Sequence, residues 1–100
     1  MIVKSLTLTG TGAVQQLSTD TRKSKWIGFS CPSTNSGTVL IGGAEVSASP
    51  AVGFPLGPGF TQFLPAISDM FEFYQFKATF LYIANGDVVN VLFGLEGSNS

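Results

Sequence analysis

Apolar and polar residues alternate at every second position along several short stretches of the chain, which is the period of a β-strand with one buried face. The clearest stretch is residues 4–9, KSLTLT, after which Gly10-Thr11-Gly12 turns the chain. Val, Ile, Thr and Phe are abundant, whereas the helix-forming residues Ala, Glu, Lys and Arg are sparse. The pattern therefore predicts an all-β protein. Further strands are predicted at 13–18, 25–31, 38–43, 44–49, 60–64, 71–76, 79–84 and 88–93.

Individual strands carry more specific expectations. In the strand at 13–18, Val14 or Leu17 is expected to face inward. The unbroken apolar run at 38–43, TVLIGG, predicts a strand covered on both faces, with a bend or bulge at its glycine pair. Residues 32–37, PSTNSG, form a wholly polar loop that we expect to be flexible. Ser68 and Asp69 could cap a helical turn over 70–73, although β structure at 71–76 is favoured.

The strongest local signal is Asn85-Gly86-Asp87, which lies between the two β-rich runs 79–84 and 88–93. Asn-Gly favours a type I′ turn, because that turn needs a positive φ at both central positions. The sequence therefore predicts that the two runs pair as a β-hairpin.

About seven or eight short strands at this spacing predict two packed antiparallel sheets, a β-sandwich or jelly roll, with a small closed β-barrel of the OB type as the alternative. One hundred residues fit one domain, here residues 1–100. We expect short flexible ends near 1–3 and 95–100.

Residues 53–60, GFPLGPGF, combine large apolar side chains with prolines and glycines and carry no charge. A phosphate-binding loop needs a Lys and a Ser or Thr, and neither is present. The prolines and glycines predict a tight, rigid loop. Its apolar groups either pack onto the protein's own core or form a contact with another subunit, and both interpretations stay open. The candidate contact residues are Phe54, Pro55, Leu56, Pro58 and Phe60.

Composition points to surface that something other than water covers. Charged residues make up 11% of the chain, against about 25% in typical soluble domains, and 44% of residues are hydrophobic. The net charge is −1 and the basic residues are scattered, so nucleic acid is not an expected partner. The cationic spot at 22–25 is interpreted as solvating charge. The sequence shows no continuous apolar run long enough to span a membrane and no convincing signal peptide.

Candidate chemistry is weak. The chain has no histidine, and its single cysteine, Cys31, lies in an apolar run, where it is expected to be a buried hydrophobe in a protein made in a reducing cytoplasm. Asp69 and Glu72 are the nearest pair of acids, and they are interpreted as solvent-facing. No metal motif occurs, and the start of a dinucleotide motif at 9–12 fails because Gln15 replaces its third glycine. The sequence predicts no enzyme and no cofactor.

The order of motifs resembles that of small β-sandwich virion proteins of tailed bacteriophages. The resemblance covers about residues 10–94 and rests on GAVQQLS at 12–18, GTVLIGGAEVS at 37–47, PLGPG at 55–59 and NGDVVNV at 85–91. It implies a jelly-roll-like fold and a structural role as a capsid decoration or cement protein, a head spike, or a fibre or tail module. Because the chain has no coiled-coil or repeat segment, a compact capsid-associated part is favoured.

The resemblance further implies that the protein binds itself, with a trimer as the best guess, and binds the major capsid protein or another virion protein. It implies synthesis in the bacterial cytoplasm and a final place on the capsid surface. The alternative function is a carbohydrate-binding module of a host-recognition apparatus. That module would stack sugars on exposed aromatic rings. The candidates for stacking are Trp26, Phe73, Tyr74 and Tyr82.

Overall fold

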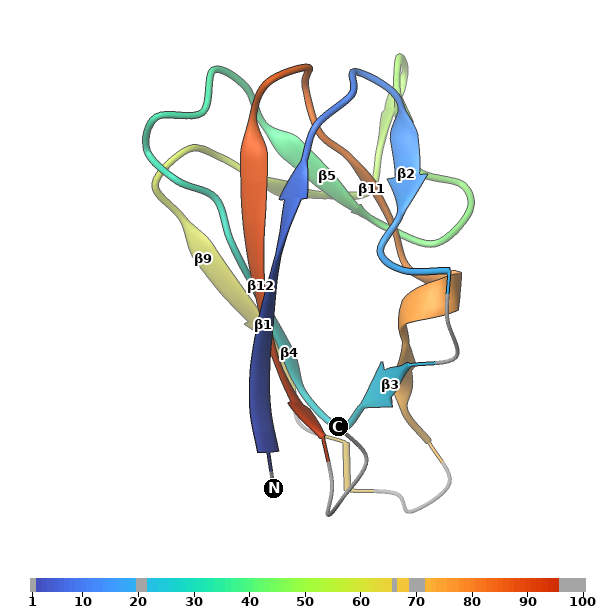
Figure 1. The fold of residues 1–100 in the computed structure, drawn as a ribbon. Coiled ribbons are helices and arrows are strands. Elements are labelled where there is room, and N and C mark those ends of the chain that lie inside the picture. The colour runs from blue at the N-terminus through green and yellow to red at the C-terminus, as the bar shows by residue number, and fades with distance from the viewer. Residues whose placement is uncertain (1, 20–21, 66, 69–71, 96–100) are drawn as a thin grey trace.

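Two four-stranded antiparallel sheets face each other in the computed structural model of the protein (Figure 1). The structure describes residues 2–19, 22–65, 67–68 and 72–95. The first sheet has the order β1-β12-β4-β9 and the second β2-β11-β5-β8. Each sheet keeps two unpaired edges among the described strands, so the fold is the predicted β-sandwich and not the closed barrel. The strands of the first sheet are β1 (Ile2–Thr9), β12 (Val88–Leu95), β4 (Ile27–Ser30) and β9 (Thr61–Leu64). Those of the second are β2 (Val14–Gln16), β11 (Phe80–Tyr82), β5 (Val39–Gly42) and β8 (Phe54–Leu56).

The pairing of these eight strands follows one rule. Taken in chain order, the first pairs with the last (β1 with β12), the second with the seventh (β2 with β11), the third with the sixth (β4 with β9) and the fourth with the fifth (β5 with β8). A chain folded back on itself in this way is one long antiparallel double ribbon. Wound into two facing sheets, that ribbon has the strand order of a jelly roll.

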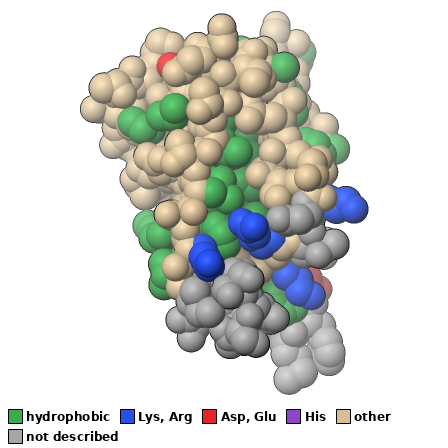
Figure 2. Space-filling view, in the orientation of Figure 1, with side chains coloured by type: hydrophobic (Ala, Val, Ile, Leu, Met, Phe, Trp, Pro, Cys, Tyr) green, Lys and Arg blue, Asp and Glu red, His purple; other side chains and the backbone are tan. Residues whose placement is uncertain are grey.

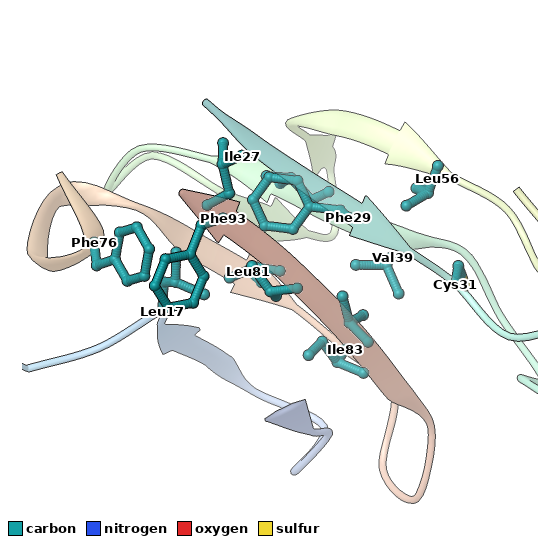
Figure 3. Packing of buried hydrophobic residues seen from close by; sticks show 13 residues of the cluster. Leu17, Ile27, Phe29, Cys31, Val39, Leu56, Phe76, Leu81, Ile83 and Phe93 are labelled. Carbon is teal, nitrogen blue, oxygen red and sulfur yellow. The ribbon is translucent and has the colours of Figure 1, made fainter. Parts of the chain in front are cut away.

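The core lies between the two sheets and is almost wholly apolar. Alternate residues of β12 point inward, so Val89, Val91 and Phe93 are buried. The Phe93 ring meets the ring of Phe76 edge-on, with centroids 4.7 Å apart (Figure 3). All three apolar residues of β5 are buried, as the continuous apolar run predicts. The core cluster consists of Leu17, Ile27, Phe29, Cys31, Val39, Ile41, Leu56, Phe76, Leu81, Ile83, Val89, Val91 and Phe93.

Short elements fill the ends of the sandwich. One two-stranded ribbon pairs β3 (Lys23–Ser24) with β10 (Tyr74–Gln75), and a 3₁₀ turn, η1 (Phe76–Ala78), follows β10. A second ribbon pairs β6 (Ser47–Ala48) with β7 (Ala51–Val52) where one strand over 44–49 was predicted. The proposed capped turn at 68–73 falls largely on residues outside the described part of the chain.

The predicted hairpin at Asn85-Gly86-Asp87 is wrong. β11 belongs to the second sheet, while β12 pairs with β1 and β4 on its two sides and has no edge left for β11. The turn therefore carries the chain from one sheet to the other. It closes through the Asp87 N–H, which donates to the Ala84 carbonyl at 2.9 Å. Gly86 has φ +89° but Asn85 has no positive φ, so the turn is of the type II kind and not type I′.

Part of the two segments that were predicted as flexible ends is paired. Ile2 pairs with Leu95 and Val3 with Gly94, so these residues belong to the β1–β12 ladder. The remaining residues of the two segments, Met1 and 96–100, lie outside the described residues. β1 begins and β12 ends at the same end of the sandwich (Figure 1).

Candidate interaction surface

The segment GFPLGPGF is only partly a loop. Gly53 has φ +135°, and β8 follows it at once, pairing with β5 so that Ile41 faces Phe54 and Val39 faces Leu56. Pro55 lies in the middle of this strand, which is tolerated because β8 is an edge of its sheet. The rigid turn that was predicted for the whole segment covers only residues 57–60, where the Phe60 N–H donates to the Gly57 carbonyl.

The candidate contact residues differ in burial although two of them share one face of β8. Leu56 is 4% exposed and belongs to the core cluster. Phe54, two residues earlier on the same face of the strand, is 49% exposed. Phe60 in the turn is 66% exposed, and Pro55 and Pro58 are exposed as well. Leu56 therefore packs inside its own subunit, whereas the two phenylalanines are accessible to a partner.

Phe63 is an exposed aromatic residue that the sequence analysis did not select. It lies in β9 opposite Gly28, and 52% of it is exposed. Its ring covers Gly28 so closely that a Cβ added there would lie 2.3 Å from the ring carbon Cε1. The ring of Trp26 lies 6.3 Å away on the same outer face of the sheet. The alternation of Thr61-Gln62-Phe63-Leu64 could have revealed this orientation if Leu64 had been assigned to the core.

An apolar cleft separates the two edge strands on this side of the sandwich. Its volume is about 360 Å³, and the core residues Phe29 and Ile41 take part in its lining. Phe54 lines it from β8, and Gln62 and Leu64 line it from β9. We call residues 54–64, which comprise the two edge strands and the turn between them, the β8–β9 flank. The remaining lining residues of the cleft are Gly42, Gly43, Ala78 and Thr79.

The β8–β9 flank belongs to a long stretch of chain almost without charge. Residues 26–68 contain one charged side chain, Glu45, and residues 46–68 contain none. Four of the seven large hydrophobic side chains that are exposed in the described part of the protein come from this stretch. They are Val52, Phe54, Phe60 and Phe63. A partner could cover the flank without removing any charge of the flank from water, which is the costly part of most interfaces.

The aromatic residues that were candidates for sugar stacking are all half-buried. Tyr74 donates its hydroxyl to the Pro65 carbonyl. The ring of Phe73 lies beneath the ammonium groups of Lys23 and Lys25, at 4.5 and 3.9 Å. Trp26 lies beside the Phe63 ring and Tyr82 belongs to β11. Phe73 directly precedes β10, which contains Tyr74, and Trp26 directly precedes β4.

Basic side chains collect at the opposite end of the molecule from the turn at 84–87. Arg22, Lys23 and Lys77 line a hollow of about 230 Å³ together with Gln75. The Arg22 guanidinium also lies 5.6 Å above the ring of Phe93. Figure 2 shows Lys and Arg side chains grouped in the lower half of the view, next to hydrophobic side chains. The residues that line the hollow come from β3 and the residue before it, from β10 and from η1.

The acidic residues in the described part of the chain form no cluster that could hold a metal ion. No group of three or more His, Cys, Asp or Glu side chains that could hold a metal ion is found there. Asp69 lies outside the described residues, so the pair it might form with Glu72 has no structural description. Lys25 donates to the main-chain carbonyl of Glu72 at 2.7 Å.

Cys31 is buried, as expected for a small hydrophobe, and only 1% of it is exposed. The side-chain amide of Asn35 lies 3.0 Å from its Sγ and also donates to the Val88 carbonyl at 2.7 Å. Asn35 accepts in turn from the Val88 N–H. The polar loop at 32–37 is therefore fixed to β12, whereas the sequence predicted a flexible segment.

Asp87 holds the same loop from its other end. Its carboxylate accepts from the N–H groups of Ser36 and Gly37, at 2.9 and 3.0 Å, and from the Ser36 hydroxyl. The Ser36 N–H is the largest cause that lowers the pKa of the Asp87 carboxyl below its ordinary value of 3.8. Burial opposes this effect, and the Gly37 N–H and the Ser36 hydroxyl reinforce it. The arrangement is a structural clamp, since Asp87 has no second titratable group beside it among these contacts.

No helix within the described residues is long and apolar enough to cross a membrane. Comparisons of the chain with protein-family models, with curated proteins and with solved structures give no significant match.

Proposed function

We propose that the protein is a structural bacteriophage virion protein, a decoration or cement subunit that binds a capsid shell and other copies of itself through the β8–β9 flank. The observation that carries the proposal is the charge-free flank, on which three phenylalanines are exposed and one of them, Phe54, lines an apolar cleft. The motif order that resembles phage virion proteins, together with the jelly-roll strand order, supports the same function.

The flank is suited to strong association. Phe54, Phe60 and Phe63 are each about half exposed or more, and covering such a side chain fully contributes roughly 1.5–3 kcal/mol. Pro55 and Pro58 restrict the backbone that presents them, so little conformational entropy is lost on binding. The cleft of about 360 Å³ offers a receiving site for an apolar side chain of the partner. Exposed side chains and a preformed cleft on one flank are what a subunit that binds in many copies requires.

The proposal includes an assembly of identical subunits, with a threefold arrangement as the expected form, on the outside of the capsid. Such a subunit needs neither a catalytic group nor a cofactor. Its contact with the shell would be made with the major capsid protein or another virion protein. We propose no separate carbohydrate-binding function, because the four aromatic candidates are half-buried.

The proposal is tested with the double variant Phe54→Ser, Phe60→Ser. Both side chains are largely exposed, so we expect the variant to fold with a near-native circular dichroism spectrum. Its self-association through the flank, followed by light scattering over a range of concentrations, should weaken by about two orders of magnitude or more. Co-sedimentation with empty phage heads from the same source should weaken in parallel.

The matched control is Val14→Ser, which removes an exposed apolar side chain from β2, outside the flank. This control should associate and bind heads as the unmodified protein does. Unchanged binding by the double variant would refute the role of the flank. Binding of a glycan array by a protein that ignores phage heads would support the carbohydrate-binding alternative instead.

A further inference from the structure

Three of the four edge strands of the sandwich are protected against pairing with another chain. β2 and β8 have three residues each, and β8 contains Pro55, which has no N–H to donate. β9 has four residues, Pro65 follows it directly, and the Phe63 carbonyl already accepts from the Gln62 side chain at 2.9 Å. Short strands, prolines and occupied backbone groups are ways in which natural proteins prevent edge-to-edge association.

The fourth edge strand, β1, is neither short nor interrupted by proline, and within the described residues only the Thr9 carbonyl at its end accepts a side-chain hydrogen bond, from Gln15. It has eight residues, and its pairing with β12 runs without a bulge from Ile2 opposite Leu95 to Thr9 opposite Val88. At about 3.3 Å per residue such a strand extends roughly 26 Å. No proline interrupts it, and Lys4 is its one charged residue. An open strand of this length is a template for another strand.

The outward backbone groups of β1 belong to its odd-numbered residues. Gly10, directly after β1, donates its N–H to the Asp87 carbonyl at 2.7 Å, so the even-numbered residues bond to β12. In agreement, the Thr9 carbonyl points the other way and accepts from the Gln15 side chain at 3.4 Å. The N–H and C=O groups of Val3 and Ser5 therefore point away from the sheet, as do those of Thr7, and no described strand pairs with them.

We propose that β1 pairs antiparallel with β1 of a second copy, about a twofold axis at Leu6. A partner for this edge must present an unprotected strand of similar length, and in the described part of the chain only β1 is such a strand. A second copy supplies it automatically. With the axis at Leu6, Ser5 bonds to Thr7 of the second copy and Val3 bonds to Thr9 of the second copy, so every outward residue of the strand is used. The long bond from Gln15 to the Thr9 carbonyl gives way to this pairing.

The side chains of β1 agree with this register. Leu6 and Leu8 are half-buried and pack against the margin of the core, and Lys4 shares their face of the strand. Figure 2 shows hydrophobic side chains in the middle of the view, above the Lys and Arg group. An axis at Leu6 places Leu6 beside its own copy and Lys4 beside Leu8. An axis at Lys4 would instead oppose two ammonium groups, which is destabilising.

This pairing leaves the β8–β9 flank uncovered, because β1 and β9 are the opposite edges of the first sheet. It therefore does not rest on the function proposed above. If a threefold contact forms through the flank as well, with its axis meeting the twofold axis at a right angle, the two contacts together generate a closed assembly of six copies. The pairing alone gives a dimer.

The first test is Ser5→Pro. The Ser5 N–H points outward, so proline removes a bond to the second copy and leaves the ladder with β12 complete. Ser5→Ala, which keeps the N–H, is the matched control. By light scattering we expect the proline variant to have half the mass of the unmodified protein, with an apparent Kd at least about tenfold weaker, and the alanine variant to be unchanged. A proline variant that keeps the parent mass overturns the proposal.

The second test does not depend on the proline variant folding. Facing residues of a non-bonded antiparallel pair have Cβ atoms about 4.5–5.5 Å apart, close enough for a disulfide after a small adjustment. Leu6→Cys should therefore cross-link to its own copy under mild oxidation at least about tenfold faster than Leu8→Cys, which faces Lys4. The buried Cys31 supplies the background rate in the unmodified protein. Equal rates for the two variants, or no cross-link in either, would overturn the register.

The same cross-link separates this inference from the proposed function. Leu6→Cys introduced into the variant Phe54→Ser, Phe60→Ser should still form the disulfide, even where binding to phage heads is lost. Loss of the cross-link in that variant would mean that the flank and not β1 brings the copies together, which would overturn the pairing while leaving the function in place.

Discussion

The charge-poor stretch at 26–68 and the cationic hollow at the β3–β10 ribbon are different kinds of surface on one small sandwich. The stretch presents Phe54, Phe60 and Phe63 to solvent and carries one charge, whereas the hollow is lined by three cations. Water solvates the hollow well and the stretch poorly. The difference teaches that the few charged side chains of the protein are unevenly distributed. They are sparse around β5, β8 and β9, and they gather at the β3–β10 ribbon, where they favour solubility.

The largest effect on stability is expected inside the charge-poor stretch itself, where Leu56 and Phe54 lie two residues apart in one strand. Leu56→Ser places a hydroxyl in the core and leaves a cavity, which should cost about 3–5 kcal/mol of unfolding free energy. Phe54→Ser changes an exposed ring and should cost at most about 1 kcal/mol. Urea denaturation of both variants measures the difference. Equal losses would mean that Phe54 is as much a core residue as Leu56.

Substitution of Gly86, in the turn that brings Asp87 to the charge-poor stretch, should have the next largest effect on stability. Gly86 has φ +89°, and nothing lies within 4 Å of an added Cβ, so a substitution there is resisted by the backbone alone. We expect Gly86→Val to lose about 1–2 kcal/mol, and Gly86→Asn to lose clearly less because asparagine tolerates positive φ. Thermal melting compares the two. A valine variant as stable as the parent would contradict the turn geometry.

Acid should weaken the link between Asp87 and the loop at 32–37. The folded pKa of Asp87 lies below 3.8, so the unfolded chain takes up the proton first as the pH falls. The stabilisation is therefore complete well above pH 3.8 and is lost as the pH falls through 3.8 towards the folded pKa. We expect Asp87→Asn to be less stable than the parent at pH 7, with the gap closing below about pH 4. A gap in melting temperature that does not depend on pH would exclude the carboxylate as the cause.

The smallest effect is expected at the cationic end. Lys23 and Lys77 are exposed, so the double variant Lys23→Gln, Lys77→Gln should change the unfolding free energy by no more than about 0.5 kcal/mol. We expect its solubility at low salt to fall while its association through the flank is retained. Sedimentation at several salt concentrations measures both. A large loss of stability would show that the hollow is structural and would remove the contrast between the two regions.

Alternation in the sequence predicted the sandwich because half-buried and exposed residues follow the strand period in the second half of β1 and throughout β9. The same reasoning missed the strand in GFPLGPGF, since proline and glycine indicate turns wherever they occur and only the edge position of β8 makes Pro55 acceptable. It also grouped Leu56 with Phe54, which share one face of β8 but differ in burial because Leu56 lies in the core cluster and Phe54 lines the open cleft. Local sequence does not carry that information.

The hairpin error has a related cause. Asn85-Gly86-Asp87 correctly indicated a tight turn, but a turn signal does not say whether the two flanking strands join one sheet or two. The binding partners of Asp87 and Asn35 were equally hidden, because the loop at 32–37 is distant in sequence from both Asp87 and Val88. The outward orientation of Phe63 follows from alternation only if Leu64 is assigned to the core, and the close contact of its ring with Gly28 makes that orientation clear.

The double-ribbon pairing has a consequence for how quickly the chain can fold. Its innermost ladder, β5 with β8, joins nearby residues such as Val39 and Leu56, whereas its outermost ladder joins Ile2 to Leu95, almost the whole chain apart. Closing the outer ladder first would cost the most loop entropy, so the ribbon is expected to zip from β5–β8 outward. High contact order of this kind places folding in the millisecond-to-second range. The β1–β12 ladder forms last, and a nascent chain cannot complete it before β12 has been synthesised.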